Sequence, residues 1–375
     1  MVSGFCLLAL VFGPAPAQSF FTARGLGELA LPADARISAL GTPEALSYGN
    51  PGIVVYLPKV SFTGSSLGVA TIGSQTGQNR LIQNVRPAGF HAAAPLPLET
   101  RLMLGIDERF NQDYSIWSES LPDSSYRYHV TGRGGIYALR CGIGWSCFKL
   151  AGIGIEYSRL LGSSREDWRF ETKNGRYVST DTVELDYSGD AIKFGTSLQT
   201  ARFALATHYS LPHCFTARSF RKVHGVIEDS LRTYRISIPS AASFGVSFSP
   251  AEQLTIALGF KHQPWHDIKV DTGHMPGALN SYRVSAGAEY LTGKIPLRLG
   301  YSYSPWYYAA RDASPIIEHG FHLGAGIPIT GFGSLEFSAG LDRRNSATLS
   351  ETSIRLMLSL AYHEAWLRRT RRWGY

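Results

Sequence analysis

Residues 282–363 contain five stretches that decide the fold: YRVSAGAEY (282–290), LRLGYSY (297–303), FHLGAGI (321–327), LEFSAGL (335–341) and IRLMLSLAYH (354–363). In each stretch, apolar or aromatic residues mostly alternate with charged residues, hydroxyl residues or glycine. A period of two places the two sets on opposite faces of a β-strand. The region therefore predicts consecutive antiparallel strands with one continuously apolar face.

Two architectures fit this pattern. In a soluble sandwich the apolar face packs against a second sheet and the polar face meets water. In an outer-membrane barrel the apolar face meets lipid and the polar face lines the lumen. The lengths of the strands and of the loops separate the two architectures.

Fourteen segments of the chain show a strand pattern: 59–72, 87–96, 99–110, 127–144, 148–160, 190–200, 202–211, 241–250, 253–263, 280–291, 295–304, 317–329, 333–343 and 351–363. Most approach the ~9–11 residues of a tilted membrane strand, whereas soluble strands are nearer ~5–6. Short connections alternate with long ones, such as 73–86, 161–189 and 212–240, as in bacterial barrels. We therefore predict an all-β fold, a transmembrane antiparallel β-barrel of about fourteen strands. Counting the charged segments 165–172 and 177–187 would give sixteen, and that alternative stays open.

The composition favours the barrel. Charged residues make up 17% of the chain, below the ~25% of ordinary soluble domains, while aromatic residues reach 12%. No stretch of ~20 apolar residues occurs, so a helical membrane span is excluded. The net charge of +7 comes partly from four arginines near the C-terminus, so no nucleic-acid partner is needed to explain it.

The ends of the chain differ from the strand region. An apolar run, 5–12, followed by Ala15-Pro16-Ala17, predicts a signal peptide over residues 1–17, with a buried strand as the alternative. Such a signal agrees with the bacterial outer membrane as the location. Residues 18–52 are irregular and precede the barrel, which we place at 53–363. Residues 364–375 form a basic tail that would face the periplasm and could contact a partner there.

Cysteines and catalytic motifs give little. Cys141 and Cys147 flank Gly144-Trp145, and they would either form a disulfide across a hairpin end or remain free. No C-x-x-C, H-E-x-x-H, G-x-S-x-G or P-loop motif occurs. We therefore expect no metal, no cofactor and no enzyme activity.

Several motifs resemble one family of membrane proteins. They are Ala39-Leu40-Gly41, Asn50-Pro51-Gly52, the hairpin 238–265 with IPSA, FGVSFSP and HQPW, and the hairpin 280–301 with SAGAEY and PLRLGY. Their order along the chain is similar to that in FadL/TodX-type transporters of long-chain fatty acids and other hydrophobic compounds. The similarity extends from about residue 25 to residue 363. Gly52 departs from the alanine usual in that family, and the tail after the last strand is a second departure.

This resemblance implies a fourteen-stranded barrel with an N-terminal hatch inside the lumen, here residues 18–52. Its hatch motifs would include Leu40, Gly41, Asn50 and Pro51. It also implies passive transport, with a lateral exit to the membrane at a kink in one strand. The alternative, suggested by the basic tail, is a barrel that serves protein secretion or envelope assembly without transport.

Charged residues on the polar faces are the candidate ligand-binding residues. They are Arg283, Arg298, Glu289, Arg355 and Glu336. Arg283 and Arg298 would bind the carboxylate of a fatty acid, because arginine holds carboxylates in a bidentate manner. The structural alternative is pairing across neighbouring strands, Glu289 with Arg298 and Glu336 with Arg355. The basic connection 212–240 would either meet outer-membrane lipid and the phosphates of lipopolysaccharide or form a solvated loop.

Overall fold

The computed structural model describes residues 19–364, apart from residues 20, 24, 58, 76–77, 120–125, 149, 173–177, 224–225, 311–313, 331 and 348. The predicted signal peptide, 1–17, and residues 365–375 of the predicted tail lie outside the described residues. Among the described residues, no helix combines the length and the hydrophobicity needed to cross a membrane.

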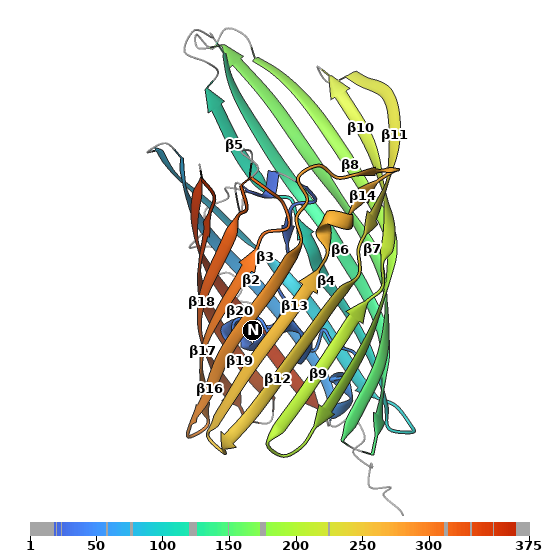
Figure 1. Ribbon diagram of the computed structural model, residues 1–375, viewed down its shortest axis with the longest axis vertical. Helices are drawn as coiled ribbons and strands as arrows, with labels where there is room; N and C mark the ends of the chain where they lie inside the picture. The colour runs from blue at the N-terminus through green and yellow to red at the C-terminus, as the bar shows by residue number, and fades with distance from the viewer. Residues whose placement is uncertain are drawn as a thin grey trace, which may run out of the picture.

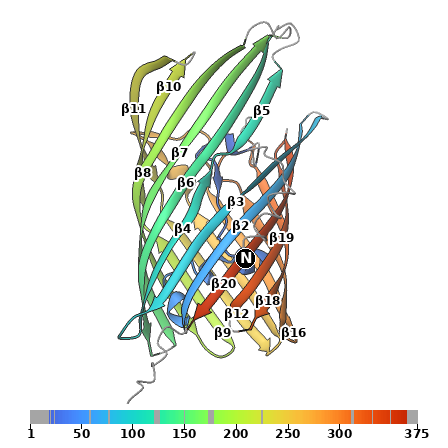
Figure 2. The ribbon, with the colours of Figure 1, turned by 180° about the vertical axis from the view of Figure 1, so that it is seen from behind.

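The described part of the chain forms a closed barrel of fourteen antiparallel strands (Figures 1 and 2). The wall strands are β2 (Val60–Gln75), β3 (Gln78–Pro95), β4 (Thr100–Asn111), β6 (Tyr126–Cys147), β7 (Ala151–Thr172), β8 (Val178–Gln199), β9 (Phe203–Ser210), β12 (Ala241–Ala251), β13 (Leu254–Gln263), β16 (Ser281–Thr292), β17 (Ile295–Pro305), β18 (Ile317–Ile329), β19 (Gly333–Asn345) and β20 (Ser350–Glu364). Pairing of β2 with β20 closes the ring. All fourteen predicted segments fall on these strands, so the fold prediction is confirmed.

The two faces of the wall point as the alternation predicts. Leu299 and Phe321 on the apolar face are 58% and 60% exposed, while Arg298 and Arg355 on the polar face are each 5% exposed. Exposed leucine, isoleucine and phenylalanine side chains continue around the outside. Because such a surface is stable only against hydrocarbon, the outer face is the membrane face and the inner face lines the lumen.

The sequence prediction was wrong about the structure of the long connections. Residues 73–86, 161–189 and 212–240 are mostly strand rather than loop. Strands β7 and β8 are 22 residues each, at least twice the ~9–11 residues that cross a membrane. The charged segments 165–172 and 177–187 are the ends of these two strands, so the sixteen-strand alternative is excluded.

Shorter strands complete the end of the barrel that carries the long connections, at the top of Figure 1. They are β5 (Tyr114–Glu119), β10 (His213–Val223), β11 (Val226–Ile238), β14 (Lys269–Val270) and β15 (Gly273–His274), with the short helix η4 (Trp265–Asp267) between β13 and β14. β10 and β11 extend the hairpin of β9 and β12 upward past Pro212 and Pro239, which lack the N–H that a ladder needs.

The N-terminal segment, residues 25–57, lies within the ring of strands (Figures 1 and 2). Its elements are β1 (Glu28–Leu29), α2 (Ala35–Ala39), η2 (Glu44–Leu46) and η3 (Val54–Tyr56), preceded by η1 (Phe21–Ala23). α2 contacts β17 to β20, η2 contacts β9, β12 and β13, and η3 contacts β4, β6 and β7. These contacts lie on opposite sides of the barrel, so the segment crosses the lumen.

Wall glycines receive the N-terminal segment. Leu40 and Gly41 lie against Gly287 and Gly300, where a Cβ atom would overlap their backbone. Pro51 packs in the same way on Gly154, where a Cβ would lie 2.5 Å from the Pro51 carbonyl oxygen. Glycine on the polar face therefore marks close approach of a second backbone.

Cys141 and Cys147 both lie on β6, six residues apart, and both are free. At ~3.3 Å per residue, six residues of strand separate their Cα atoms by roughly 20 Å. A disulfide requires Cα atoms within about 7 Å, so the bridged alternative is excluded within this chain.

Adding one methyl group to Gly154 tests the contact with the N-terminal segment. We expect Gly154→Ala to lower the melting temperature of the purified protein, because overpacking a close contact costs about 1–3 kcal/mol. The measurement is thermal unfolding in detergent by circular dichroism. Gly64→Ala is the matched control, since a Cβ there meets nothing within 4 Å. Equal melting temperatures for the two variants would contradict this packing.

Candidate functional site

The wall has a break between β3 and β4. The two strands pair only from Gly89–Asp107 to Pro95–Arg101, although β3 continues to Gln78 and pairs with β2 from Ala93 to Gln78, with one register shift. Beyond Asp107 the free edge of β4 pairs instead with β1 of the N-terminal segment. The amide of Ala30 also donates to the carbonyl of Arg109 at 3.1 Å.

Two local irregularities produce the break. Pro87 on β3 has no N–H to donate, and the register between β2 and β3 shifts beside it. On β4 the register with β6 shifts between Glu108 and Phe110, so Arg109 is an extra residue. Such a bulge bends a strand, and here β4 turns its edge toward β1. Sequence analysis did not locate this kink, and the proline inside a strand was the available signal.

Side chains close the break where the backbone ladder is missing. The Arg86 guanidinium lies 2.7 Å from the Glu108 carboxylate, and both side chains are buried. The Asn84 amide donates to Asp113 at 2.7 Å. Polar side chains therefore join the two strand edges at the break, which we call its rims. Such side-chain contacts separate more readily than a ladder of backbone hydrogen bonds.

A cavity of about 110 Å³ lies on the lumen side of the break, between the N-terminal segment and the wall. Its lining includes Asp107, Glu108, Arg109 and Phe110 from the kinked part of β4. The apolar part of the lining comes from Phe110, Leu160, Ile238 and Trp265, and the polar part includes Glu44, Arg140, Lys193, His208 and Lys261. The cavity therefore offers an apolar side and a charged side to one ligand.

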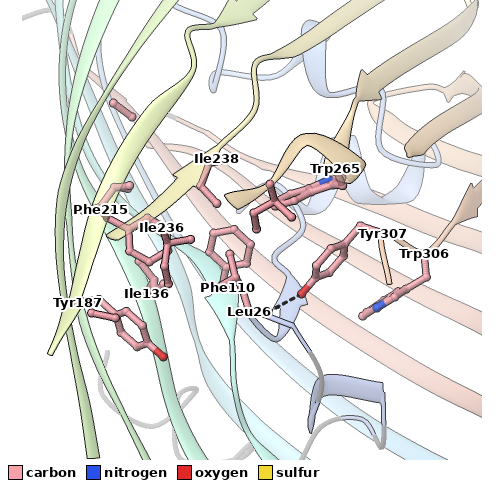
Figure 3. Close-up of a cluster of buried hydrophobic side chains, with 14 of the residues drawn as sticks. Leu26, Phe110, Ile136, Tyr187, Phe215, Ile236, Ile238, Trp265, Trp306 and Tyr307 are labelled. Atoms are coloured by element: carbon pink, nitrogen blue, oxygen red, sulfur yellow. Dashed lines mark hydrogen bonds between the residues drawn. The ribbon is translucent and has the colours of Figure 1, made fainter. Parts of the chain in front are cut away.

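An apolar cluster continues from this cavity toward the end with the long connections (Figure 3). Trp265 packs edge-to-face on Phe110 with ring centroids 6.0 Å apart, and on Tyr307 at 4.7 Å. The amide of Leu26 donates to the Tyr307 hydroxyl at 2.9 Å, which ties the N-terminal segment to the cluster. Apolar side chains therefore pack together in the upper lumen and join the N-terminal segment to the wall.

A charged network forms the other side of the cavity. Arg140 pairs with both Asp107 and Glu156, and Lys193 lies 3.2 Å from Glu156. Arg140 and Lys193 each also donate to the Gly49 carbonyl, at 3.0 and 3.1 Å. These bonds anchor the N-terminal segment to β6 and β8, so most of the cavity's charges are already neutralised.

Glu44 of the N-terminal segment pairs with Lys261 of β13 at 2.8 Å. Burial alone would raise the pKa of this carboxyl, but the charge and hydrogen bond of Lys261 outweigh burial and lower the pKa to about 2. The neighbouring Asp34, which caps α2, has a raised pKa because burial outweighs its hydrogen bonds and the charge of Arg36.

The five candidate ligand-binding residues lie elsewhere, in ion pairs. Glu289 pairs with Arg298 at 2.6 Å, as predicted. The predicted pairing of Glu336 with Arg355 is wrong, because Glu336 faces Ser359 on β20 and pairs with Arg298 at 2.5 Å. Arg355 instead pairs with Asp342 at 3.2 Å and with Glu28 at 3.0 Å.

These candidates also belong to other spaces in the lumen. Glu289, Arg298 and Glu336 line a separate cavity of about 380 Å³ at the end with the short turns, below α2. Arg283 lies 3.3 Å from Glu318 and lines, with Arg355, a small space of about 20 Å³. The structure therefore does not bring the five candidates to the cavity beside the break.

The predicted residues of the N-terminal segment lie at its contacts with the wall. The Asn50 amide donates to the carbonyls of Ala45 and Thr207, at 2.9 and 3.1 Å, and its own oxygen accepts from Gly52. Asn50 therefore holds the turn and fixes it to β9. Leu40, Gly41 and Pro51 contribute the close backbone contacts with wall glycines.

Comparison with known proteins identifies the fold. No protein-family profile and no curated protein matches the sequence. Among solved structures, the monoaromatic hydrocarbon channel CymD matches at a TM-score of 0.63 and 12% identity over 90% of this chain and 99% of that one. A FadL homologue of Pseudomonas aeruginosa gives 0.60 and 13% over 93% and 98%, and the toluene transporter TodX of P. putida gives 0.61 and 13% over 91% and 99%. The chain thus has the barrel fold of FadL-type transporters, as its motifs implied.

The Glu44–Lys261 pair predicts a pH dependence of stability. Because folding lowers the pKa of Glu44 from 4.5 to about 2, the pair stabilises the protein above pH 4.5 and loses this effect as the pH falls toward 2. Glu44→Gln should therefore be less stable than the wild type at pH 7, and the difference should shrink between pH 4.5 and pH 2. Glu252→Gln in an exposed turn is the control, with unfolding in urea as the measurement. A difference independent of pH would contradict the assignment.

Proposed function

We propose that this protein is a passive channel for hydrophobic compounds in a bacterial outer membrane, which binds its ligand in the lumen and releases it sideways through the wall. The observation that carries the proposal is the break between β3 and β4 directly beside a partly apolar cavity. The names of the fold relatives, a hydrocarbon channel and a toluene transporter, agree with such a ligand.

A hydrophobic molecule is more stable in hydrocarbon than in water, and this difference favours release through the wall. Apolar side chains of the upper lumen take it from water, which stabilises it by roughly 25 cal/mol for each Å² buried. An exit in the wall delivers it to hydrocarbon without a second aqueous layer. The N-terminal segment 25–57 crosses the lumen and supports this direction, because it obstructs the axial path. It would act as the hatch.

The break would open when the side-chain contacts across it part. Arg86 and Glu108 hold the rims together without any backbone bond between β3 and β4 at that level. Opening the break would part this ion pair and the Asn84–Asp113 hydrogen bond, whereas opening the wall elsewhere would break several ladder bonds. Long-chain fatty acids remain a proposed ligand class alongside smaller hydrocarbons.

Partners in the membrane follow from the outer surface. Arg218 on β10 and Arg235 on β11 are exposed near the long-connection end of the barrel. In the proposed orientation these arginines meet the phosphates of lipopolysaccharide, to which guanidinium groups bind well. A periplasmic partner for the tail 364–375 remains a prediction.

Crosslinking the rims tests lateral release. In a variant with Cys141, Cys147 and Cys214 replaced by serine, Arg86→Cys and Glu108→Cys are joined by a short thiol-cleavable crosslinker. We expect toluene uptake by bacterial cells carrying the protein to fall to the level of cells lacking it, and reduction to restore it. Uptake of palmitate is measured in parallel.

The control joins Ala92→Cys to Leu104→Cys, a pair that faces across the intact ladder of β3 and β4. This crosslink should leave uptake unchanged, because that part of the wall has no opening. Normal toluene uptake with the rims crosslinked would overturn lateral release at this position. Equal uptake by cells with and without the uncrosslinked protein would overturn the channel itself.

A further inference from the structure

Arg109 differs from the other strong cations that line the 110 Å³ cavity. Arg140, Lys193 and Lys261 each lie within 4.0 Å of a carboxylate. No carboxylate of the described residues lies within that distance of the half-buried Arg109 side chain, and none of its side-chain nitrogens has a hydrogen-bond partner there. Its backbone, in contrast, is fixed by Ala30.

The strand irregularity places this charge beside the exit. Arg109 is the extra residue of the β4 bulge, between Glu108 of the rim and Phe110 of the apolar cluster. Three of the acids that line the cavity are paired with cations: Asp107 with Arg140, Glu108 with Arg86, and Glu44 with Lys261. The fourth, Asp34, accepts hydrogen bonds from the backbone amides of its own helix α2. An anion from outside would therefore be the partner that this guanidinium lacks.

Apart from Arg140, whose Nε makes no hydrogen bond but whose Nη atoms are paired, two described residues of the lining have a buried polar atom without a partner. His208 Nδ1 and Trp265 Nε1 are buried and make no hydrogen bond within the part of the chain that the structure describes. Buried polar groups in proteins are nearly always bonded, so these atoms need either water or the polar atoms of a ligand as partners. A pure hydrocarbon would leave Arg109 and both of these atoms unsatisfied.

The size of the cavity limits the ligand. An apolar cavity of about 150 Å³ is known to hold benzene, so a volume of about 110 Å³ is on the scale of a single aromatic ring. A long alkyl chain does not fit within such a space. The ring would lie against Phe110, Leu160, Ile238 and Trp265.

We infer that this cavity binds small monocarboxylates with an apolar body of about one aromatic ring, held by a bidentate bond from Arg109. This inference rests on the proposed function and narrows its ligand class. Arginine suits the task because its planar fork matches a carboxylate and its charge is weakly hydrated. The cavity would prefer such a carboxylate over a neutral hydrocarbon of the same shape, because the hydrocarbon leaves the charge of Arg109 unpaired.

Benzoate and toluene form a matched ligand pair, because they share a ring and differ in the carboxylate. Binding of each to the purified wild-type protein in detergent is measured by equilibrium dialysis with labelled ligand. We expect Arg109→Gln to weaken benzoate binding about ten- to hundredfold, the worth of a hydrogen bond to a charged group. Toluene binding should stay within about twofold, and Arg109→Lys should recover part of the benzoate affinity.

Arg133→Gln is the control, since Arg133 is exposed on β6 and does not line the cavity. Circular dichroism and slower gel migration on heating establish that each variant forms the barrel. Unchanged benzoate affinity in folded Arg109→Gln, or palmitate binding in this cavity as tightly as benzoate, would overturn the inference. If such a result is obtained but toluene uptake still stops when the rims are crosslinked, the proposed channel stands. If, in addition, toluene uptake does not depend on the protein, both proposals are overturned.

Discussion

The closed backbone ladder is the constraint on which this structure depends. In hydrocarbon no water satisfies a free N–H or C=O, so each wall strand must be paired on both sides. The chain meets this demand around the ring and departs from it at one described place, where β3 and β4 part. There the edge of β4 is not left bare, because β1 supplies the missing partner from inside. β1 thus stabilises the break on its β4 side, over two residue pairs, while polar side chains hold the β3 side.

The same constraint explains the alternation of residues and the role of the N-terminal segment. Because apolar side chains must face lipid, charged residues gather on the inner face and neutralise one another. Glu28 shows how the segment takes part: its backbone pairs with β4, while its carboxylate pairs with Arg344 and Arg355 on the opposite strands β19 and β20. β1 therefore links β4 to β19 and β20 across the lumen. Its removal would leave Arg344 and Arg355 without this partner.

The sequence predicted the fold well where lipid imposes the pattern. All fourteen wall strands were found, because a membrane-facing strand cannot vary its outer residues freely. Prediction was wrong beyond the membrane, where water accepts charge on either face and strands such as β7 continue through Arg165 and Asp167 without alternation. Site residues were harder still. The sequence correctly predicted that Arg298 and Glu336 lie on the inner face. Which residue each one pairs with depends on the register between neighbouring strands, which no single strand encodes.

The contacts of the N-terminal segment also have a consequence for the assembly of the barrel. Residues 25–57 precede every wall strand in the chain, yet they touch both the early strand β4 and the last strand β20. The full set of contacts between this segment and the wall can therefore form only once β20 is in place, at the final seam with β2. The residues that are synthesised before every wall strand are thus among the last to complete their packing.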